Sequence, residues 1–132
     1  MKPTTANGQS ASTHLIYIVD DEAMIVTLIE AILGPAGYRL KSFRDPGHVL
    51  QAFNDSKTKP DLLITDFAMG AVNGLELIEQ TKKLHPKLRT IIVSGVTTEG
   101  MMRFAPIKPD RFLAKPFQSK SLLDLVQSVL NA

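Results

Sequence analysis

Short apolar runs alternate along the chain with longer segments in which apolar residues recur at helical spacing. Residues 14–19 (HLIYIV) form a continuously apolar, β-branched run, which is typical of a strand buried on both faces of a parallel sheet. The same pattern predicts further strands at residues 38–43, 61–65, 89–93 and 111–114.

The segments between these runs predict helices, because their apolar residues repeat every three or four positions. The first helix is closed by a Gly-Pro pair at residues 34–35. Asp45 is a suitable N-cap for the second helix, and Pro46 suits its first position. Residues 74–84 and 119–130 predict two more helices. The helically spaced apolar residues of the first, third and last helices are Met24, Ile25, Leu28, Ile29, Ile32, Leu33, Leu75, Ile78, Leu84, Leu122, Leu125, Val126 and Val129.

A further helix is expected between the fourth and fifth strands, at residues 97–105. Gly100 lies within it, and Pro106 and Pro109 follow it, so we expect a short or irregular helix. Its large apolar residues suit the core, and the alternative is an adaptable partner surface, since methionine repacks readily. These residues are Met101, Met102 and Phe104.

Five strands that alternate with five helices predict an α/β domain with a parallel sheet. Right-handed crossovers restrict the possible topologies to a few. The sequence has no internal repeat, and no linker is long enough to separate two domains. We therefore expect one domain over residues 14–132, preceded by a flexible polar tail at residues 1–13.

The composition of the chain says little about its fold, but it excludes several kinds of functional site. The 132 residues contain no cysteine, which excludes a disulfide, a zinc-thiolate site and a cysteine nucleophile. The formal net charge is only +2 and no long basic run occurs, so we expect neither nucleic acid nor a membrane as a partner. No apolar stretch approaches the roughly 20 residues of a membrane span. The N-terminus lacks the apolar centre of a signal peptide, and a cytoplasmic protein is expected.

Polar and charged residues stand where the predicted strands end. Asp20 and Asp21 follow the first strand, Asp66 the third, Ser94 the fourth and Lys115 the fifth. In an open parallel sheet the carboxyl ends of the strands share one edge, where ligands bind. We therefore expect three carboxylates, a hydroxyl and an ammonium in one small pocket.

This set of side chains favours magnesium and phosphate chemistry. Three clustered carboxylates repel one another and are stable as anions only around a cation. Hard oxygen ligands without sulfur or histidine favour Mg²⁺, which also binds phosphate groups. Lys115 adds a positive charge for a phosphate oxygen, and Ser94 adds a neutral donor. The Asp66 carboxylate is a competent nucleophile once phosphoryl charge is neutralised, and it would form an acyl phosphate.

Each of these residues also has a structural alternative. Asp20 and Asp21 could only cap the first helix, Asp66 could be a solvated loop residue, Ser94 could mark a turn and Lys115 could simply be exposed. Their occurrence at four strand ends favours the pocket. The three histidines share no ligand spacing and are expected on the surface or at helix ends; they are His14, His48 and His85.

Four motifs carry a specific resemblance to a known family: YIVDDE at 17–22, ITDFAMGAVNGLEL at 64–77, IIVSG at 91–95 and FLAKPF at 112–117. From about residue 14 to residue 130, the chain resembles the receiver domain of two-component response regulators. The resemblance implies a flavodoxin-like, doubly wound five-stranded sheet of order 2-1-3-4-5 with five helices. It also implies a signal-transduction phosphoprotein that has no separate substrate reaction.

The resemblance implies a role for each residue of the pocket. Asp66 matches the phosphoacceptor, and Asp20 and Asp21 match the acidic pair that helps to bind Mg²⁺. Ala68 matches the position whose backbone carbonyl ligates the metal. Lys115 resembles the invariant lysine of the family.

The resemblance also implies a switch. Ser94 resembles the switch hydroxyl and Phe112 the switch aromatic, and Pro116 suggests a cis peptide bond after Lys115. In such proteins phosphorylation draws the hydroxyl toward the phosphate, and the aromatic ring turns inward. The surface of the fourth helix, fifth strand and fifth helix then changes its preference for a partner.

Two features depart from the family pattern. Met69-Gly70 stands where the family commonly has Met-Pro, and glycine frees that loop. The positions two residues after the acceptor and two after the switch hydroxyl are Ala68 and Val96, which cannot position a hydrolytic water. We therefore expect slower self-dephosphorylation than in a fast chemotaxis-type regulator.

The main hypothesis is a phosphoacceptor switch that takes its phosphoryl group from a histidine kinase or a histidine phosphotransfer protein and then binds a downstream protein. The alternative is a phosphorylation-independent receiver that serves as an interaction module, which predicts loss of pocket residues. An aspartyl phosphatase is disfavoured, because it would need a second carboxylate at Ala68. The partners, the oligomeric state, and whether the domain stands alone or belongs to a larger regulator stay open.

Overall fold

The computed structural model describes residues 14–70, 72–95 and 106–131. The elements in chain order are β1 (Leu15–Val19), α2 (Ala23–Leu33), β2 (Arg39–Phe43), α3 (Pro46–Asp55), β3 (Leu62–Asp66), α4 (Gly74–Leu84), β4 (Arg89–Ser94), β5 (Arg111–Ala114) and α6 (Ser119–Leu130). The helix expected at residues 97–105 and the tail expected at residues 1–13 lie outside the described residues.

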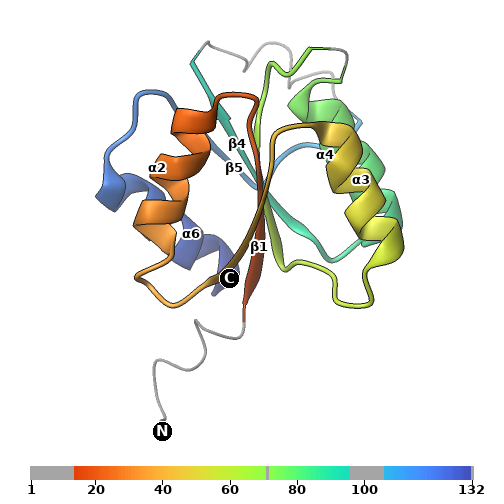
Figure 1. Ribbon diagram of the computed structural model, residues 1–132, viewed down its shortest axis with the longest axis horizontal. Coiled ribbons are helices and arrows are strands. Elements are labelled where there is room, and N and C mark those ends of the chain that lie inside the picture. The colour runs from red at the N-terminus through yellow and green to blue at the C-terminus, as the bar shows by residue number, and fades with distance from the viewer. Residues whose placement is uncertain (1–13, 71, 96–105, 132) are drawn as a thin grey trace, which may run out of the picture.

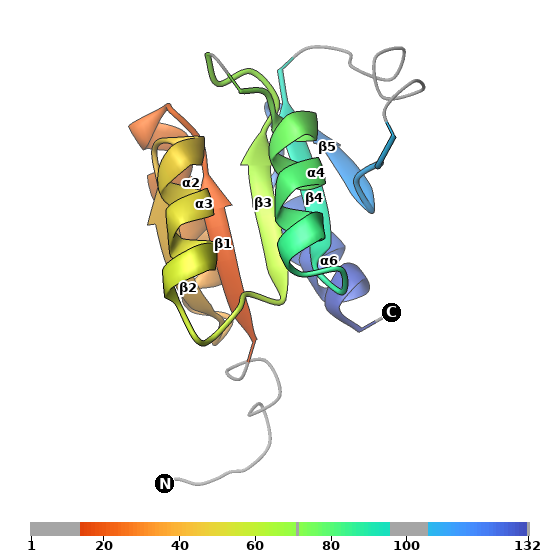
Figure 2. The same cartoon turned by 90° about the vertical axis from the view of Figure 1, so that its right-hand side faces the viewer.

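The five strands form one parallel sheet in the order β2-β1-β3-β4-β5, which confirms the predicted order. Helices α2 and α6 cover one face of the sheet, while α3 and α4 cover the other (Figure 1). All strands run in the same direction, so their carboxyl ends meet at the upper edge in Figure 2.

Side chains that alternate across the sheet build two separate cores, because successive residues of a strand point to opposite faces. Ile16 and Ile18 of β1 pack with α2 and α6, whereas Tyr17 and Val19 pack with α3 and α4. The continuous apolar runs of the sequence therefore mark strands covered on both faces, as predicted.

Helix boundaries follow local capping chemistry. Asp45 caps α3 as predicted, since its carboxylate accepts a hydrogen bond of 2.6 Å from the Gly47 N–H. Helix α4 begins with a capping box between Asn73 and Glu76, which the sequence analysis did not identify. Asp66 and Ser94 are the last residues of their strands rather than the first residues after them.

Two helices present apolar residues to solvent at positions expected from helical spacing to face inward. Leu84 at the end of α4 is 45% exposed, whereas Leu77 is fully buried. Leu88, from the connection to β4, fills the same core and leaves Leu84 outside it. On α2, Met24 and Leu28 are exposed, and Val26 is buried in their place.

None of the helices in the described part of the chain has the length and apolar character required to cross a membrane.

The burial difference within α4 gives a matched test of the fold. We expect Leu77→Ala to lower the free energy of unfolding by about 2–5 kcal/mol, because it opens a cavity in the core. The same substitution at Leu84 should cost less than about 1 kcal/mol, because its side chain is largely solvated. Chemical denaturation of both variants measures the difference; equal losses would contradict the observed orientation of α4.

Candidate functional site

The strand ends bring the predicted residues together at one edge of the sheet. Asp20 follows β1 and Asp66 ends β3, and these two strands are neighbours. Ser94 ends β4, and its carbonyl accepts a hydrogen bond of 2.8 Å from the backbone N–H of Lys115, just after β5. The ends of four strands therefore lie along one edge of the sheet, and the side chains of Asp20, Asp66 and Lys115 meet there.

Lys115 links the carboxylates of this pocket. Its Nζ lies 3.0 Å from Oδ2 of Asp20 and 3.1 Å from Oδ1 of Asp66. The exposed Glu22 carboxylate lies 3.6 Å away. Asp20, Asp66 and Lys115 are all largely buried, and ions removed from water are tolerated only when they are paired in this way.

The charges of the pocket shift the protonation of its members. Burial raises the pKa of Asp66, the nearby Asp20 charge raises it further, and the hydrogen bond from Lys115 offsets only part of this rise. Burial acts to lower the pKa of Lys115, but its hydrogen bonds to Asp20 and Asp66 outweigh this effect and raise it. Lys115 therefore holds its proton firmly.

Asp20, Asp21 and Asp66 form a candidate metal site. One carboxylate oxygen from each lies within 4.8 Å of the other two. All three donors are hard oxygens, which suits Mg²⁺, an ion that keeps several waters when it binds to proteins. Asp21 is exposed, and no described residue forms a hydrogen bond or ion pair with its carboxylate, so this side of the site is open to solvent.

The connection from β3 to α4 holds Asp66 tightly from behind. The Gly74 N–H donates to the Phe67 carbonyl at 2.7 Å, and a Cβ added to Gly74 would lie only 2.5 Å from the Asp66 carbonyl oxygen. The Thr65 hydroxyl donates to that same oxygen at 2.9 Å. Glycine at position 74 is thus required by close approach of the backbone.

The same connection explains the departure from the Met-Pro pattern. Gly70 has φ of +80°, a left-handed conformation that proline cannot adopt. Met69 is buried, while Ala68 is exposed and lies two residues beyond Asp66. Position 68 therefore carries a small apolar side chain two residues after Asp66.

A contact that the sequence analysis missed holds the acidic segment 20–22. Arg44 lies just beyond β2, and its Nε and Nη2 groups donate to the Asp21 carbonyl at 3.1 and 2.7 Å. The Asp20 N–H donates to the Phe43 carbonyl at 3.2 Å. The only available signal was the adjacency of β1 and β2, which places their carboxyl ends side by side.

The two residues that match the switch positions occupy the β4–β5 side of the sheet. Ser94 is 2% exposed, and Phe112 packs, partly buried, against the core beneath α3 and α4. The peptide bond between Lys115 and Pro116 is cis, as expected. Val96 and the apolar residues 101, 102 and 104 lie outside the described residues.

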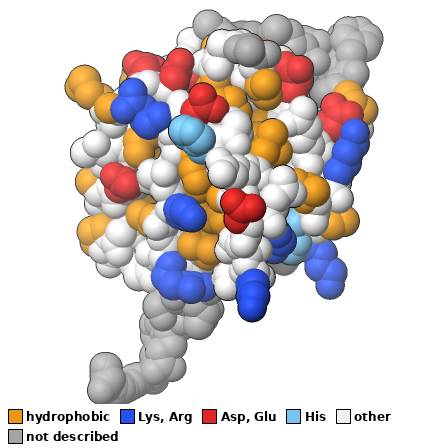
Figure 3. Space-filling model, turned by 45° about the vertical axis from the view of Figure 1, so that its right-hand side comes forward, with side chains coloured by type: hydrophobic (Ala, Val, Ile, Leu, Met, Phe, Trp, Pro, Cys, Tyr) orange, Lys and Arg blue, Asp and Glu red, His pale blue; other side chains and the backbone are white. Residues whose placement is uncertain are grey.

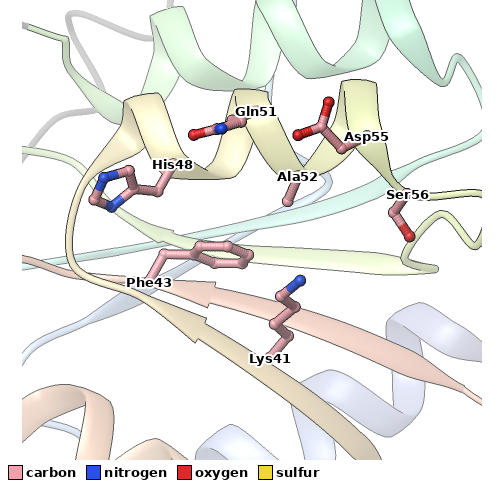
Figure 4. Close-up of a pocket in the computed structure, with 7 residues that line it drawn as sticks. All are labelled: Lys41, Phe43, His48, Gln51, Ala52, Asp55 and Ser56. Atoms are coloured by element: carbon pink, nitrogen blue, oxygen red, sulfur yellow. The ribbon is translucent and has the colours of Figure 1, made fainter.

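The histidines take no part in this pocket. His48 lies with Lys41 and Phe43 in a hollow of about 370 Å³ between β2 and α3 (Figure 4). His14 and His85 line another hollow of about 230 Å³ beside Arg89, at the start of β4. Basic and acidic side chains are interspersed on the face seen in Figure 3, with no large area of one charge.

An apolar surface on α2 adjoins the pocket. Met24 is 84% exposed and lies two residues beyond Glu22, which contacts Lys115. Together with its neighbours it borders a shallow hollow of about 570 Å³ that is almost entirely apolar. We call this the α2 apolar face; it consists of Ala23, Met24, Ile25, Thr27, Leu28 and Ala31.

Comparison with known proteins agrees with this geometry. Residues 16–127 match the family described as response regulator receiver domain, and the chain belongs to this family. Receiver domains are signalling modules rather than classical enzymes; they are phosphorylated by histidine kinases and interact with downstream targets. The clustered aspartates fit a phosphorylation and metal site.

The relatives include both longer regulators and single domains. The chain is 32% identical to the DNA-binding transcriptional regulator NtrC of Azospirillum brasilense over 92% of its length, but spans only 25% of that protein. It is 29% identical to the chemotaxis protein CheY of Bacillus subtilis, covering 89% of this chain and 98% of the relative. A receiver domain protein from Methanospirillum hungatei has a TM-score of 0.82 at 26% identity, with 89% and 94% of the two chains covered.

The close approach at Gly74 gives a test of how the end of β3 is held. We expect Gly74→Ala to lower the free energy of unfolding by about 1–3 kcal/mol, because the new methyl group would overlap the Asp66 carbonyl. Without that contact, alanine in a helix would stabilise the protein by about 0.4–1 kcal/mol. Gly95→Ala is the control, since its added Cβ would meet nothing nearer than the Lys115 Cβ at 4.0 Å. Thermal unfolding distinguishes the two signs.

Proposed function

We propose that this chain is a phosphoacceptor switch of a two-component phosphorelay and that Asp66 receives the phosphoryl group. The observation that carries the proposal is the buried Asp66 carboxylate, which lies against Lys115 and within a cluster of three carboxylates. Such a cluster attracts a divalent cation, and its lysine can neutralise a phosphate oxygen.

Each pocket residue has a distinct task in this proposal. An Asp66 oxygen bonds to phosphorus while the P–N bond of the donor phosphohistidine breaks and the imidazole leaves. Lys115, which now binds Asp66, turns to a phosphoryl oxygen. Asp20 and Asp21, with the Ala68 carbonyl and Asp66 itself, would hold Mg²⁺. The ion would supply positive charge that offsets the phosphoryl oxygens.

The switch would then act on the β4–β5 side. Ser94 is buried at the end of β4 and its backbone is joined to Lys115, so a phosphoryl group bound by Lys115 would lie near its hydroxyl. Phe112 is only partly buried, and in this proposal its ring would change its packing. The proposed output surface comprises residues 97–105, β5 and α6, which would select a downstream protein.

The α2 apolar face supports a protein donor rather than only a small molecule. A phosphohistidine can reach Asp66 only if its own protein rests on the rim of the pocket, and this face lies on that rim. Exposed apolar side chains such as Met24 and Leu28 are typical of surfaces that bind another protein. We therefore place the donor, a histidine kinase or histidine phosphotransfer protein, against α2.

A receiver that acts without phosphorylation is the second candidate. It requires no acidic cluster and no paired lysine, yet Asp20, Asp66 and Lys115 are retained in a buried, hydrogen-bonded arrangement. Unneeded buried charges would be costly, so the intact pocket favours the phosphoacceptor.

The direct test is covalent labelling. With acetyl phosphate and Mg²⁺, we expect the wild type to gain the mass of one phosphoryl group and Asp66→Ala to gain none. Asp21→Ala should be labelled at least about tenfold more slowly, because loss of one ligand weakens metal binding. Intact-mass measurement follows the adduct.

Asp124→Ala is the matched control, since it removes an exposed carboxylate that pairs with Lys120 within α6, away from the acidic cluster. It should be labelled like the wild type. An adduct that persists in Asp66→Ala, or no adduct with any donor, would reject the proposed acceptor and favour the interaction module.

The second test concerns the lifetime of the acyl phosphate. Because Ala68 cannot hold a hydrolytic water, we expect the phosphoryl group to persist for minutes or longer after the donor is removed. Ala68→Asn should shorten the lifetime, since an amide there can position water. Loss of label measured over time by intact mass decides the point; a wild-type lifetime of seconds would contradict it.

A further inference from the structure

The acidic segment 20–22 contains one residue that is well anchored, Asp20, and one that is exposed to solvent, Asp21. Asp20 is fixed on both sides: its N–H donates to Phe43, and its Oδ1 accepts the Glu22 N–H at 2.8 Å. Asp21 is exposed, and among the described residues no side chain forms a hydrogen bond or ion pair with its carboxylate. The direction of the Asp21 side chain therefore depends on how its backbone is held.

Arg44 provides that backbone anchor. Two of its N–H groups, Nε at 3.1 Å and Nη2 at 2.7 Å, converge on the single Asp21 carbonyl oxygen. Two donors from a planar guanidinium restrict the position of the peptide far more than one would. The peptide plane in turn restricts the Cα–Cβ direction of Asp21, which points its carboxylate at the metal site.

The backbone of Arg44 is held by hydrogen bonds of both neighbouring residues. Arg44 lies between Phe43, the last residue of β2, and Asp45, the N-cap of α3. Phe43 is tied to Asp20 by its carbonyl, and the Asp45 carboxylate is bound to the Gly47 N–H. The backbone of Arg44 is thus fixed on both sides, so its side chain spans from one rigid strand end to the next.

We infer that Arg44 is a positioning residue for the metal site: it holds the Asp21 carboxylate in place for a divalent cation through the Asp21 carbonyl. This inference rests on the proposed function, because it assumes that Mg²⁺ binds at Asp20, Asp21 and Asp66. It adds a residue outside the acidic cluster, from a neighbouring strand, that sets the affinity of the site.

Geometry and charge make opposite predictions for this residue. Arg44 carries a positive charge close to a cation site, so removal of that charge alone should strengthen Mg²⁺ binding. If Arg44 positions Asp21, its removal should weaken binding instead, as loss of an outer contact does in other metal sites. The sign of the change therefore separates the two effects.

The experiment is calorimetric titration of the full chain with MgCl₂ and no phosphodonor. We expect Arg44→Ala to weaken Mg²⁺ binding on the order of tenfold. Arg44→Lys keeps the charge and a single donor nitrogen, so it should restore part of the loss. Lys41→Ala is the matched control, since it removes the same charge from β2, the strand that precedes Arg44, and the Lys41 ammonium lies over the Phe43 ring rather than against the acidic segment. It should bind at least as tightly as the wild type.

A double-mutant cycle tests whether Arg44 acts through Asp21. In an Asp21→Ala background, Arg44→Ala should cause no further loss of Mg²⁺ affinity. Thermal unfolding of each variant checks that the fold is kept; if Arg44→Ala unfolds, Arg44→Lys alone carries the comparison.

The outcomes separate this inference from the function on which it rests. Equal or tighter Mg²⁺ binding by Arg44→Ala would overturn the positioning role while leaving the phosphoacceptor proposal intact. Additive losses in the cycle would also overturn it. No Mg²⁺ binding by the wild type would overturn both.

Discussion

Mutual repulsion among carboxylates at one edge of the sheet is the constraint on which this structure depends. Parallel strands deliver Asp20 and Asp66 to adjacent ends, where burial and the nearby Asp20 charge raise the pKa of Asp66. Lys115 offsets this by donating to both at 3.0–3.1 Å. The Lys115 ammonium is the counter-charge to these two carboxylates. In the proposed phosphorylated state, a divalent cation would offset the carboxylates, and Lys115 would offset the phosphoryl group.

The two cores serve this edge in different ways. The core beneath α2 and α6 fixes β1 and β3 from one side, while the core beneath α3 and α4 fixes them from the other. Double coverage leaves the central strands no freedom to separate, so their end residues keep a constant spacing. Outside these cores, Asp21 and Glu22 are exposed at the rim of the pocket, and Phe112 is only partly buried.

Sequence reasoning located the pocket because its logic depends only on where strands end. An apolar run precedes each of four residues, Asp20, Asp66, Ser94 and Lys115. Because the strands are parallel, the ends of these runs meet at one edge of the sheet. Sequence reasoning failed where a contact depends on the reach of a long side chain, or where two residues compete for one place in the core. The contact of Arg44 with the Asp21 carbonyl depends on a long, flexible side chain crossing between strands. Leu84 was expected to face inward, but Leu88 occupies that end of the core.

The close packing of Gly74 behind Asp66 restricts the direction in which the end of β3 can move. Gly74 packs so closely on the Asp66 carbonyl that the end of β3 has no room to move toward the start of α4. On the side of its carboxylate, Asp66 is bound to Lys115, whose backbone N–H is bound to the Ser94 carbonyl. If Asp66 is phosphorylated as proposed, the added charge and bulk would therefore be accommodated on the β4–β5 side rather than at the start of α4.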